Sequence, residues 1–560
     1  MNNPRLFLWV ALALILFLNY ETWMKDYGTT PASAAEVAAA AKAAPDLDAA
    51  PPQVAGDSGS ASPVPAAAAP TAALAGASTP EAEPAGRNIT VRTDVLDLTI
   101  NLRGGELNRA DILQYPKVKN EPGVPVRILR NEGPDSLYVM QSGLAGDAAS
   151  GARPTHRALY ESNFESFVML QEADTLKVPL TWTSADGVTV TKTFVFHRGS
   201  YKVDLEYSVQ NAGTAPWAAA SYVQIKHDMP PVERSYFNVD SYSFTGPALW
   251  DGTKYRKLKI EKTDDQNVAL DVTKGWFAAL EHHFVGAMIP AADVAYHYTL
   301  KARGHEYLAT VMGPTQTVQP GAAGTFKETL FVGPKLQAQL EPIHPELSRV
   351  ADYGMLTMIS RPLFYVLKNV HQLFGNWGWT IVFTTLLLKL LFYPLSEASG
   401  KSMAKMRTLG PRIKNLQETY ADDREKLGRA MMDLYKREKI NPAAGCLPML
   451  IQLPVFLAFY WVLLESVEMR QAPFIGWIND LSSRDPFFIL PALMAIAMFV
   501  QYKINPKPAD EMQAKVMMIL PLVMSVTFAF FPSGLVLYWV TNTVLGILQQ
   551  WNINRRLGAA

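Results

Sequence analysis

Hydrophobic and polar residues are distributed very unevenly at the start of the chain. An apolar run over 6–18, extended by aromatic and Met side chains to residue 24, approaches the ~20 residues that span a bilayer. We interpret residues 1–27 as a transmembrane anchor that stays uncleaved, because the nearest small-residue cleavage motif, at 32–34, lies well beyond the apolar run. A cleaved signal peptide is the alternative. Residues 28–86 are mostly Ala, Pro, Ser and Gly and can bury little apolar surface, so we expect a disordered linker.

Residues 87–340 alternate apolar and polar side chains with a period of two, which is typical of strands. The clearest case is 188–196, which reaches a turn at 197–200 and returns as 201–209. This arrangement predicts an antiparallel hairpin. Gly and Pro punctuate the whole region, so we predict a large antiparallel β-sandwich in which one face of each sheet is buried.

Residues 346–374 repeat apolar side chains at helical spacing, with a break at Pro362 and several charges between them. This pattern predicts an amphipathic helix in the membrane interface, and a packed linker helix is the alternative. Five apolar segments follow, each a candidate membrane span: 377–396, 446–466, 487–503, 516–531 and 533–551. Between the last two the chain turns at Pro532-Ser533-Gly534, which overlaps the start of the last segment and predicts a tight hairpin.

The positive charges lie beside some of these segments and not beside others. Eleven Lys and Arg residues lie in 397–445, against two in 467–486. By the positive-inside rule, 397–445, 504–515 and the tail 552–560 are cytoplasmic. Together with the anchor, the five segments make six spans, which put both termini in the cytoplasm and the β-sandwich outside. The predicted fold class is therefore a multidomain α-helical polytopic membrane protein with a large all-β periplasmic domain.

One charged residue lies inside the first of the five segments. Placing the Lys389 ammonium at mid-bilayer would cost about 2.5–3.5 kcal/mol, so we expect it to face a wet cavity or to extend toward the lipid headgroups. Thr385 lies one turn away on the same helix face, and Gln452 and Asn542 lie at mid-depth or in the cytoplasmic half of their own segments. Polar residues that only pack helices together are the alternative for each. Because they share one depth and aromatic residues fill the outer half, we predict a hydrophilic recess that opens to the cytoplasm and ends halfway.

The basic segment 397–445 contains two stripes of apolar residues at near-heptad spacing, the first beginning at Met403. Two helices with such stripes predict an antiparallel cytoplasmic hairpin, with a bend at 410–411. Either the stripes bury each other in a closed coiled coil, or Met403, Met406 and Met431 form an adaptable surface that contacts apolar segments of a partner.

Composition and charge exclude several classes of function. The 560 residues carry 51 Lys and Arg against 51 Asp and Glu, which excludes a globally basic nucleic-acid binder, so we expect no DNA partner. Cys446 is the only cysteine, which excludes an intrachain disulfide framework and a cysteine metal cluster. The sequence contains no nucleophile elbow, zinc-protease motif or P-loop, so we predict neither an enzyme nor a cofactor or metal site.

Seven short segments of 377–551 carry a family resemblance: Trp377-Gly378 through Tyr393-Pro394-Leu395, Ser402 to Arg407, Asn441-Pro442, Gly445 to Pro448, Gln452-Leu453-Pro454, Glu468 to Pro473 and Phe531 to Tyr538. They resemble the membrane core of the YidC (YidC/Oxa/Alb) membrane-protein insertase family, and the anchor, linker and β-domain resemble its Gram-negative members. The resemblance implies a bacterial inner-membrane protein that inserts and helps fold membrane proteins, alone or beside the Sec translocon. The implied partners are nascent membrane proteins, Sec components and the lipid bilayer, with the ribosome left open.

The resemblance also implies an inward-open groove that holds one essential basic residue. This residue is often arginine in the family, and Lys389 occupies the matching position, which keeps the charge but loses the bidentate fork of a guanidinium. Thr385, Gln452 and Trp539 match groove-lining positions. We expect the groove to shorten the hydrocarbon path of a polar segment, with Lys389 attracting acidic residues. The alternative from another class is a membrane-anchored periplasmic module that binds carbohydrate or peptide on the β-sandwich.

Overall fold

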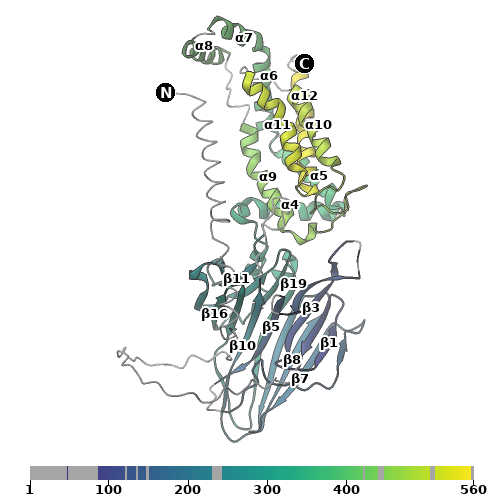
Figure 1. The fold of residues 1–560 in the computed structure, drawn as a ribbon, viewed down its shortest axis with the longest axis vertical. Helices are drawn as coiled ribbons and strands as arrows, with labels where there is room; N and C mark the ends of the chain where they lie inside the picture. The colour runs from purple at the N-terminus through teal and green to yellow at the C-terminus, as the bar shows by residue number, and fades with distance from the viewer. Residues whose placement is uncertain are drawn as a thin grey trace, which may run out of the picture.

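The computed structural model describes Leu47 and residues 86–556, except 120, 122, 134–135, 147–150, 230–242, 421–422, 439–446 and 505–510. The predicted anchor, the linker apart from Leu47 and Gly86, and the tail after residue 556 lie outside the described residues. Figure 1 shows that the described chain forms a β-rich part and a helical part, stacked along the long axis of the molecule.

The first sheet of the β-rich part has eleven strands among the described residues. All its pairings are antiparallel except that between β1 and β6. The strands follow the order β13 (Asn267–Thr273), β16 (Ala295–Arg303), β17 (Glu306–Met312), β10 (Trp217–Asp228), β5 (Leu137–Ala145), β4 (Pro125–Asn131), β3 (Glu106–Pro116), β2 (Leu96–Asn101), β1 (Asn88–Arg92) and β6 (Ser166–Val168), with β18 (Gln316–Val318) beside β10.

The second sheet has eight strands among the described residues. Their order is β12 (Tyr255–Lys257), β11 (Gly246–Trp250), β14 (Trp276–Leu280), β15 (Phe284–Ile289), β19 (Ala323–Pro334), β9 (Lys202–Asn211), β8 (Val188–His197) and β7 (Thr175–Thr183). The predicted hairpin is confirmed as β8 and β9, paired from Val188 opposite Asn211 to Phe196 opposite Val203. Alternate side chains of these strands are buried in one core shared by the two sheets, so the predicted β-sandwich is confirmed.

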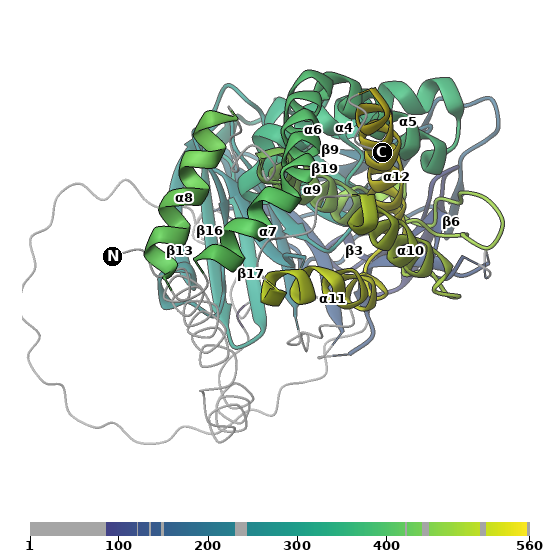
Figure 2. The same ribbon diagram turned by 90° about the horizontal axis from the view of Figure 1, so that it is seen from above.

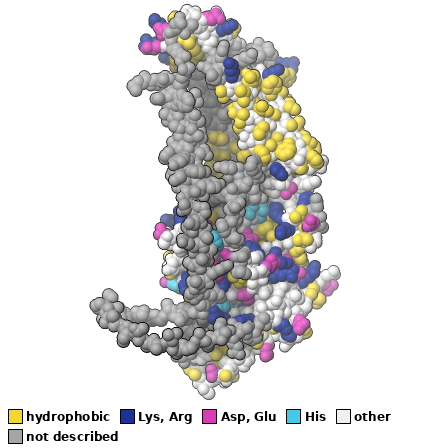
Figure 3. All heavy atoms as spheres, viewed as in Figure 1, with side chains coloured by type: hydrophobic (Ala, Val, Ile, Leu, Met, Phe, Trp, Pro, Cys, Tyr) yellow, Lys and Arg dark blue, Asp and Glu magenta, His cyan; other side chains and the backbone are white. Residues whose placement is uncertain are grey.

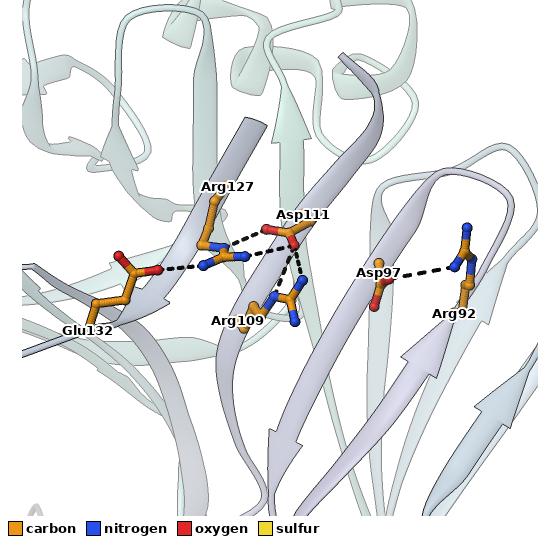
Figure 4. Close-up of polar contacts among 6 residues, drawn as sticks. All are labelled: Arg92, Asp97, Arg109, Asp111, Arg127 and Glu132. Atoms are coloured by element: carbon orange, nitrogen blue, oxygen red, sulfur yellow. Dashed lines mark hydrogen bonds and ion pairs between the residues drawn. The ribbon is translucent and has the colours of Figure 1, made fainter. Parts of the chain in front are cut away.

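A chain of ion pairs crosses strands β3 and β4 of the first sheet (Figure 4). The Asp111 carboxylate, only 3% exposed, accepts hydrogen bonds from Arg109 Nε at 2.9 Å and Arg127 Nε at 2.7 Å. Arg127 also pairs with Glu132. Because one buried carboxylate holds two guanidinium groups on neighbouring strands, it fixes their pairing where the ladder between β3 and β4 shifts register.

The chain leaves the sandwich through short helical turns and then forms α4. These elements are α3 (Gln337–Leu340), η4 (Pro345–Val350), η5 (Gly354–Leu356) and α4 (Thr357–Phe374). The break expected at Pro362 is wrong, because Pro362 lies inside α4, which continues to Gly375 in the left-handed conformation (φ 62°). One side of α4 packs against the helical part, whereas Met358 and Leu373 are 89% and 81% exposed. The helix thus lies at the junction of the two parts (Figure 1).

Eight further α-helices follow among the described residues: α5 (Trp377–Leu391), α6 (Tyr393–Thr408), α7 (Gly410–Thr419), α8 (Arg424–Arg437), α9 (Leu447–Glu465), α10 (Ile489–Ile504), α11 (Glu511–Phe528) and α12 (Ser533–Arg556), with the short 3-10 helix η7 (Val467–Met469) between α9 and α10. In the view down the long axis, α12 lies beside α5 and α10, and α11 lies on the outer side of α10 (Figure 2). Helices α7 and α8 project from the end opposite the β-rich part (Figure 1).

The expected span 377–396 is two helices rather than one. Helix α5 ends at Leu391, and the axis bends by 66° into the helix that begins at Tyr393. Pro394 accounts for the break, because it lacks an N–H and its ring blocks the carbonyl one turn earlier, whereas the first turn of a new helix accepts it. The turn between the last two segments is also displaced, because 529–532 separate α11 from α12 and Ser533 already begins α12.

Membrane-crossing length is reached in only one place among the described residues. No single described helix is both long and apolar enough, but the bent pair of α5 and α6 reaches it together. Shorter apolar helical stretches are 451–465, 489–504 and 518–528. On the face seen in Figure 3, hydrophobic side chains gather over the helical part, with charged side chains above and below them. Helices α5, α10 and α11 expose many large apolar side chains. They are Leu386, Leu387, Leu390, Leu391, Leu493, Ile496, Phe499, Val516, Ile519, Leu522 and Val526.

Candidate functional site

A cavity lies among helices α5, α6, α9 and α12. Four of the five predicted groove residues line it: Thr385 and Lys389 from α5, Gln452 from α9 and Asn542 from α12. The other lining residues are mostly apolar: Leu388, Phe392, Leu395, Ser396, Ile451, Val455 and Tyr538. The tertiary structure therefore brings polar residues from three distant segments into one apolar-walled site.

Lys389 lies in the last turn of α5, directly before the bend. The carbonyl end of a helix carries partial negative charge, so this position favours an ammonium group. Thr385, one turn earlier, donates its hydroxyl proton to the carbonyl of Ile381 at 2.7 Å. Lys389 itself forms no ion pair or hydrogen bond with any residue in the described part of the chain. It therefore brings an uncompensated positive charge to the cavity.

Gln452 on α9 and Asn542 on α12 bring amide groups to the cavity. Gln452 lies within hydrogen-bonding reach of the Tyr538 hydroxyl, and Tyr538 is 2% exposed. The Tyr538 ring stacks on Phe459 with 4.5 Å between the ring centroids, which holds the hydroxyl in place. Asn542 follows Tyr538 by one turn, so both residues lie on the same face of α12. Both line the cavity that Lys389 also lines.

Trp539 is not among the residues that line the cavity. Its ring packs against Phe456 and Phe528, with centroid distances of 4.8 and 5.2 Å. Phe528 in turn contacts Phe531 at 5.2 Å. These rings are nearer than Asn542 to the end of α12 that faces the β-rich part, so Trp539 belongs to an aromatic cluster beside the cavity. Its predicted role in binding substrate stays a prediction.

The segment after α9 contacts the ends of α5 and α12 that lie nearest the β-rich part. The Ser533 N–H donates to the carbonyl of Ser483 at 2.7 Å, and the Gly534 N–H donates to that of Leu481 at 2.9 Å. These bonds satisfy the free amides of the first turn of α12. At α5, a Cβ on Gly378 would lie 2.0 Å from the Phe474 ring, so only glycine allows this approach. The end of the bundle nearest the β-rich part is therefore tightly packed.

Direct hydrogen bonds join the β-rich part to the end of α9. The His282 ring nitrogen Nε2 lies 2.9 Å from the carbonyl of Leu464, and Lys335 Nζ donates to the carbonyl of His282 at 2.8 Å. Burial lowers the pKa of Lys335 to about 8. Nearby, Arg470 donates to the carbonyl of Pro116 at 3.0 Å. Sequence reasoning missed this joint, because Arg470 and Pro116 are 354 residues apart and no local pattern signals such a contact.

Helices α7 and α8 lie in the segment predicted to form a cytoplasmic hairpin, and they share a small apolar core. Leu409 and Ile413 are buried in it, and Met406 and Met431 pack against them. These two methionines thus contribute to the closed coiled-coil alternative, while Met432 beside them is 52% exposed. The side chain of Met403 lies outside what the structure describes. That this segment forms a cytoplasmic hairpin stays a prediction, as does its contact with substrates.

Within the described residues, no group of three or more His, Cys, Asp or Glu side chains is placed to hold a metal ion.

Comparison with known proteins decides the family. The YidC periplasmic domain family matches residues 88–366, and the 60Kd inner membrane protein family matches residues 369–559. The membrane protein insertase YidC of Thioalkalivibrio sulfidiphilus is 44% identical over 571 aligned positions, which cover 100% of this chain and 99% of the relative. That of Nitrosococcus oceani is 42% identical over 563 positions, with the same shares covered. This chain belongs to the YidC family of membrane protein insertases.

A solved structure described as an active YidC insertase with its first transmembrane domain resolved aligns with a TM-score of 0.37 and 19% identity, covering 83% of this chain and 94% of that chain. Membership of the YidC family confirms the predicted insertase function and favours it over the periplasmic binding module. The YidC relatives are named for inserting membrane proteins, and their names describe no chemical reaction. The β-rich part corresponds to the periplasmic domain of the family, and the chain is accordingly an inner-membrane insertase with a periplasmic domain.

Proposed function

We propose that this insertase receives polar segments of its substrates in the cavity around Lys389. A hydrophilic tail or loop meets water and a positive charge part of the way into the membrane, so less hydrocarbon remains for it to cross. Each charged residue otherwise costs about 2.5–3.5 kcal/mol at the bilayer centre. The apolar helix of the substrate then leaves sideways into the lipid, and no covalent step is needed.

The observation that carries this proposal is the convergence of Lys389, Gln452 and Asn542 on one cavity, with an ammonium group that lacks a partner among the described residues. An unpaired ammonium attracts carboxylates, so acidic residues in the moving segment gain most. The membrane potential adds to this selectivity, because it favours outward movement of negative charge by ~2.3 kcal/mol per charge and 100 mV.

The proposed arrangement in the membrane has six spans, with both termini and 397–445 in the cytoplasm. Two observations support it. Eleven Lys and Arg residues lie in 397–445, and the hairpin of α7 and α8 projects from the end of the helical part opposite the β-rich part (Figure 1). In this orientation the cavity opens toward the cytoplasm and the aromatic cluster lies on the periplasmic side. We propose that the chain acts alone or beside the Sec translocon, with the ribosome as a further candidate partner.

The test compares Lys389→Ala, Lys389→Arg and the control Lys503→Ala in a strain depleted of its own insertase. Lys503 lies in the last turn of neighbouring α10 and does not line the cavity. We expect Lys389→Ala to insert a substrate with an acidic tail at least tenfold less well, whereas Lys389→Arg and Lys503→Ala retain insertion. Full activity of Lys389→Ala at equal protein levels would refute the role of Lys389 but not the family assignment.

A further inference from the structure

Gly546 lies on the same face of α12 as the two cavity residues of that helix. Tyr538, Asn542, Gly546 and Gln550 follow one another at intervals of one turn, so they form a single row along α12. Tyr538 and Asn542 line the cavity, and Gln550 donates to the carbonyl of Gly400 on α6 at 3.4 Å. Gly546 is the one position in this row that has no side chain.

Two polar side chains from other helices converge on Gly546. A Cβ placed there would lie 3.6 Å from Lys389 Nζ and 3.8 Å from Gln501 Nε2. Lys389 comes from α5 and Gln501 from α10, so three helices meet at this point. Neither Lys389 nor Gln501 forms a hydrogen bond or ion pair with another residue that the structure describes.

Packing does not require glycine at this position. Distances of 3.6 and 3.8 Å are ordinary van der Waals contacts, so a methyl group would fit. By contrast, a Cβ on Gly400 would lie 2.7 Å from Ile553, and one on Gly378 would collide with Phe474. Gly546 also has no positive φ angle to explain it, and glycine is a poor helix former. What its missing side chain provides is access to the two polar groups.

We propose that Gly546 is a positioning residue for insertion, which leaves the Lys389 ammonium and the Gln501 amide open to a carboxylate on the polar segment of a substrate. The inference rests on the proposed role of Lys389. The ammonium supplies the charge and the amide supplies a second hydrogen bond, so an acidic side chain is held by two groups. An apolar side chain at 546 covers both groups and removes water from the ammonium.

The experiment compares Gly546→Leu, Gly546→Ala and Gly546→Ser with the control Val544→Leu in the full chain. Val544 is 42% exposed on the same helix and takes no part in the cavity. Two versions of one substrate are inserted, one with an acidic tail and one whose Asp and Glu are replaced by Asn and Gln. We expect Gly546→Leu to lower insertion of the acidic version at least tenfold and that of the neutral version less than twofold. Gly546→Ala gives a smaller loss, while Gly546→Ser and Val544→Leu stay within twofold of the parent.

A second measurement separates access from folding. With Cys446 replaced by Ser throughout, Lys389→Cys is labelled with a polar maleimide with and without Gly546→Leu, and we expect at least fivefold slower labelling with Gly546→Leu. Equal losses for both substrate versions, or unchanged labelling, would overturn the inference, since either result means that Gly546 acts only through packing. If Lys389→Ala loses insertion but Gly546→Leu keeps it, the inference fails while the proposed function stands. If Lys389→Ala keeps insertion, the proposed function is refuted, and the inference, which rests on it, is refuted with it.

Discussion

Lys192 is a lysine in the core of the β-sandwich, and its removal tests how a buried charge is stabilised. It occupies an inward position of β8 and is 0% exposed. Its Nζ donates to three backbone carbonyls, those of Gly104 at 2.6 Å, Gly105 at 3.1 Å and Ser142 at 3.0 Å. Burial lowers its pKa from 10.5 to about 7, while the charge of Glu106 acts in the opposite direction.

The sign of the pH effect follows from the two pKa values. The unfolded chain keeps the Lys192 proton up to about pH 10.5, whereas the folded chain releases it near pH 7. Between these values the unfolded state binds more protons, so the free energy of unfolding rises with pH. From pH 7 to pH 9 the gain is about 2 kcal/mol, because the slope is half of ~1.36 kcal/mol per pH unit at pH 7 and approaches the full value only above it.

The perturbation is Lys192→Met, which removes the titrating group and leaves three carbonyls without their donor. We expect the variant to lose about 2 kcal/mol relative to the parent between pH 7 and pH 9, because only the parent gains stability there. Denaturant unfolding of the full chain, followed by the circular dichroism of the β-sandwich, measures this difference. The control is Lys177→Met on neighbouring β7, where the side chain is exposed. Parallel stability curves for the parent and Lys192→Met over this range would refute the reasoning.

Three further predictions concern other parts of the fold. Burial raises the pKa of Glu328 from 4.5 to about 7, so the parent loses stability as the pH rises through this window. The free energy of unfolding of the Glu328→Gln variant should therefore rise by about 3 kcal/mol relative to that of the parent between pH 4.5 and 7, in the same unfolding assay. Asp111→Asn should lower stability by only about 1 kcal/mol, because both paired arginines are over a third exposed and water weakens the ion pairs. Asp97→Asn, whose ion pair spans 4.0 Å, should change stability by less than ~0.5 kcal/mol. Equal effects of the two substitutions would contradict the assigned ion-pair network. Gly378→Ala should lower the stability of the detergent-solubilised protein against heat by about 2 kcal/mol. Gly410→Ala, with no neighbouring atom within 4 Å of the added Cβ, should leave it unchanged. Unchanged stability of Gly378→Ala would show that the close approach of Phe474 to α5 is relaxed in solution.

Local patterns were sufficient for the β-sandwich, and they selected four residues that line one cavity, whose roles stay predictions. Period-two alternation predicted β8 and β9 because one face of each strand must be buried, and this requirement acts residue by residue. The shared depth of Lys389, Gln452 and Asn542 followed from counting helical rise within each segment, which needs no knowledge of how the helices pack. The family resemblance added Trp539, whose ring the structure places in the neighbouring aromatic cluster.

Other features depend on contacts between distant segments and could be known only from the tertiary structure. Helix α5 ends at Leu391 because Pro394 follows. The size of the bend, 66°, and its direction depend on what α6 packs against. The joint between His282 and Leu464 connects residues 182 positions apart. The convergence of Lys389 and Gln501 on Gly546 needs three helices in fixed registers. The sequence by itself determined which residues are apolar, charged or helix-breaking, because these are properties of single side chains and their near neighbours. Only the tertiary structure decided which of them meet, because that depends on the packing of whole helices and sheets.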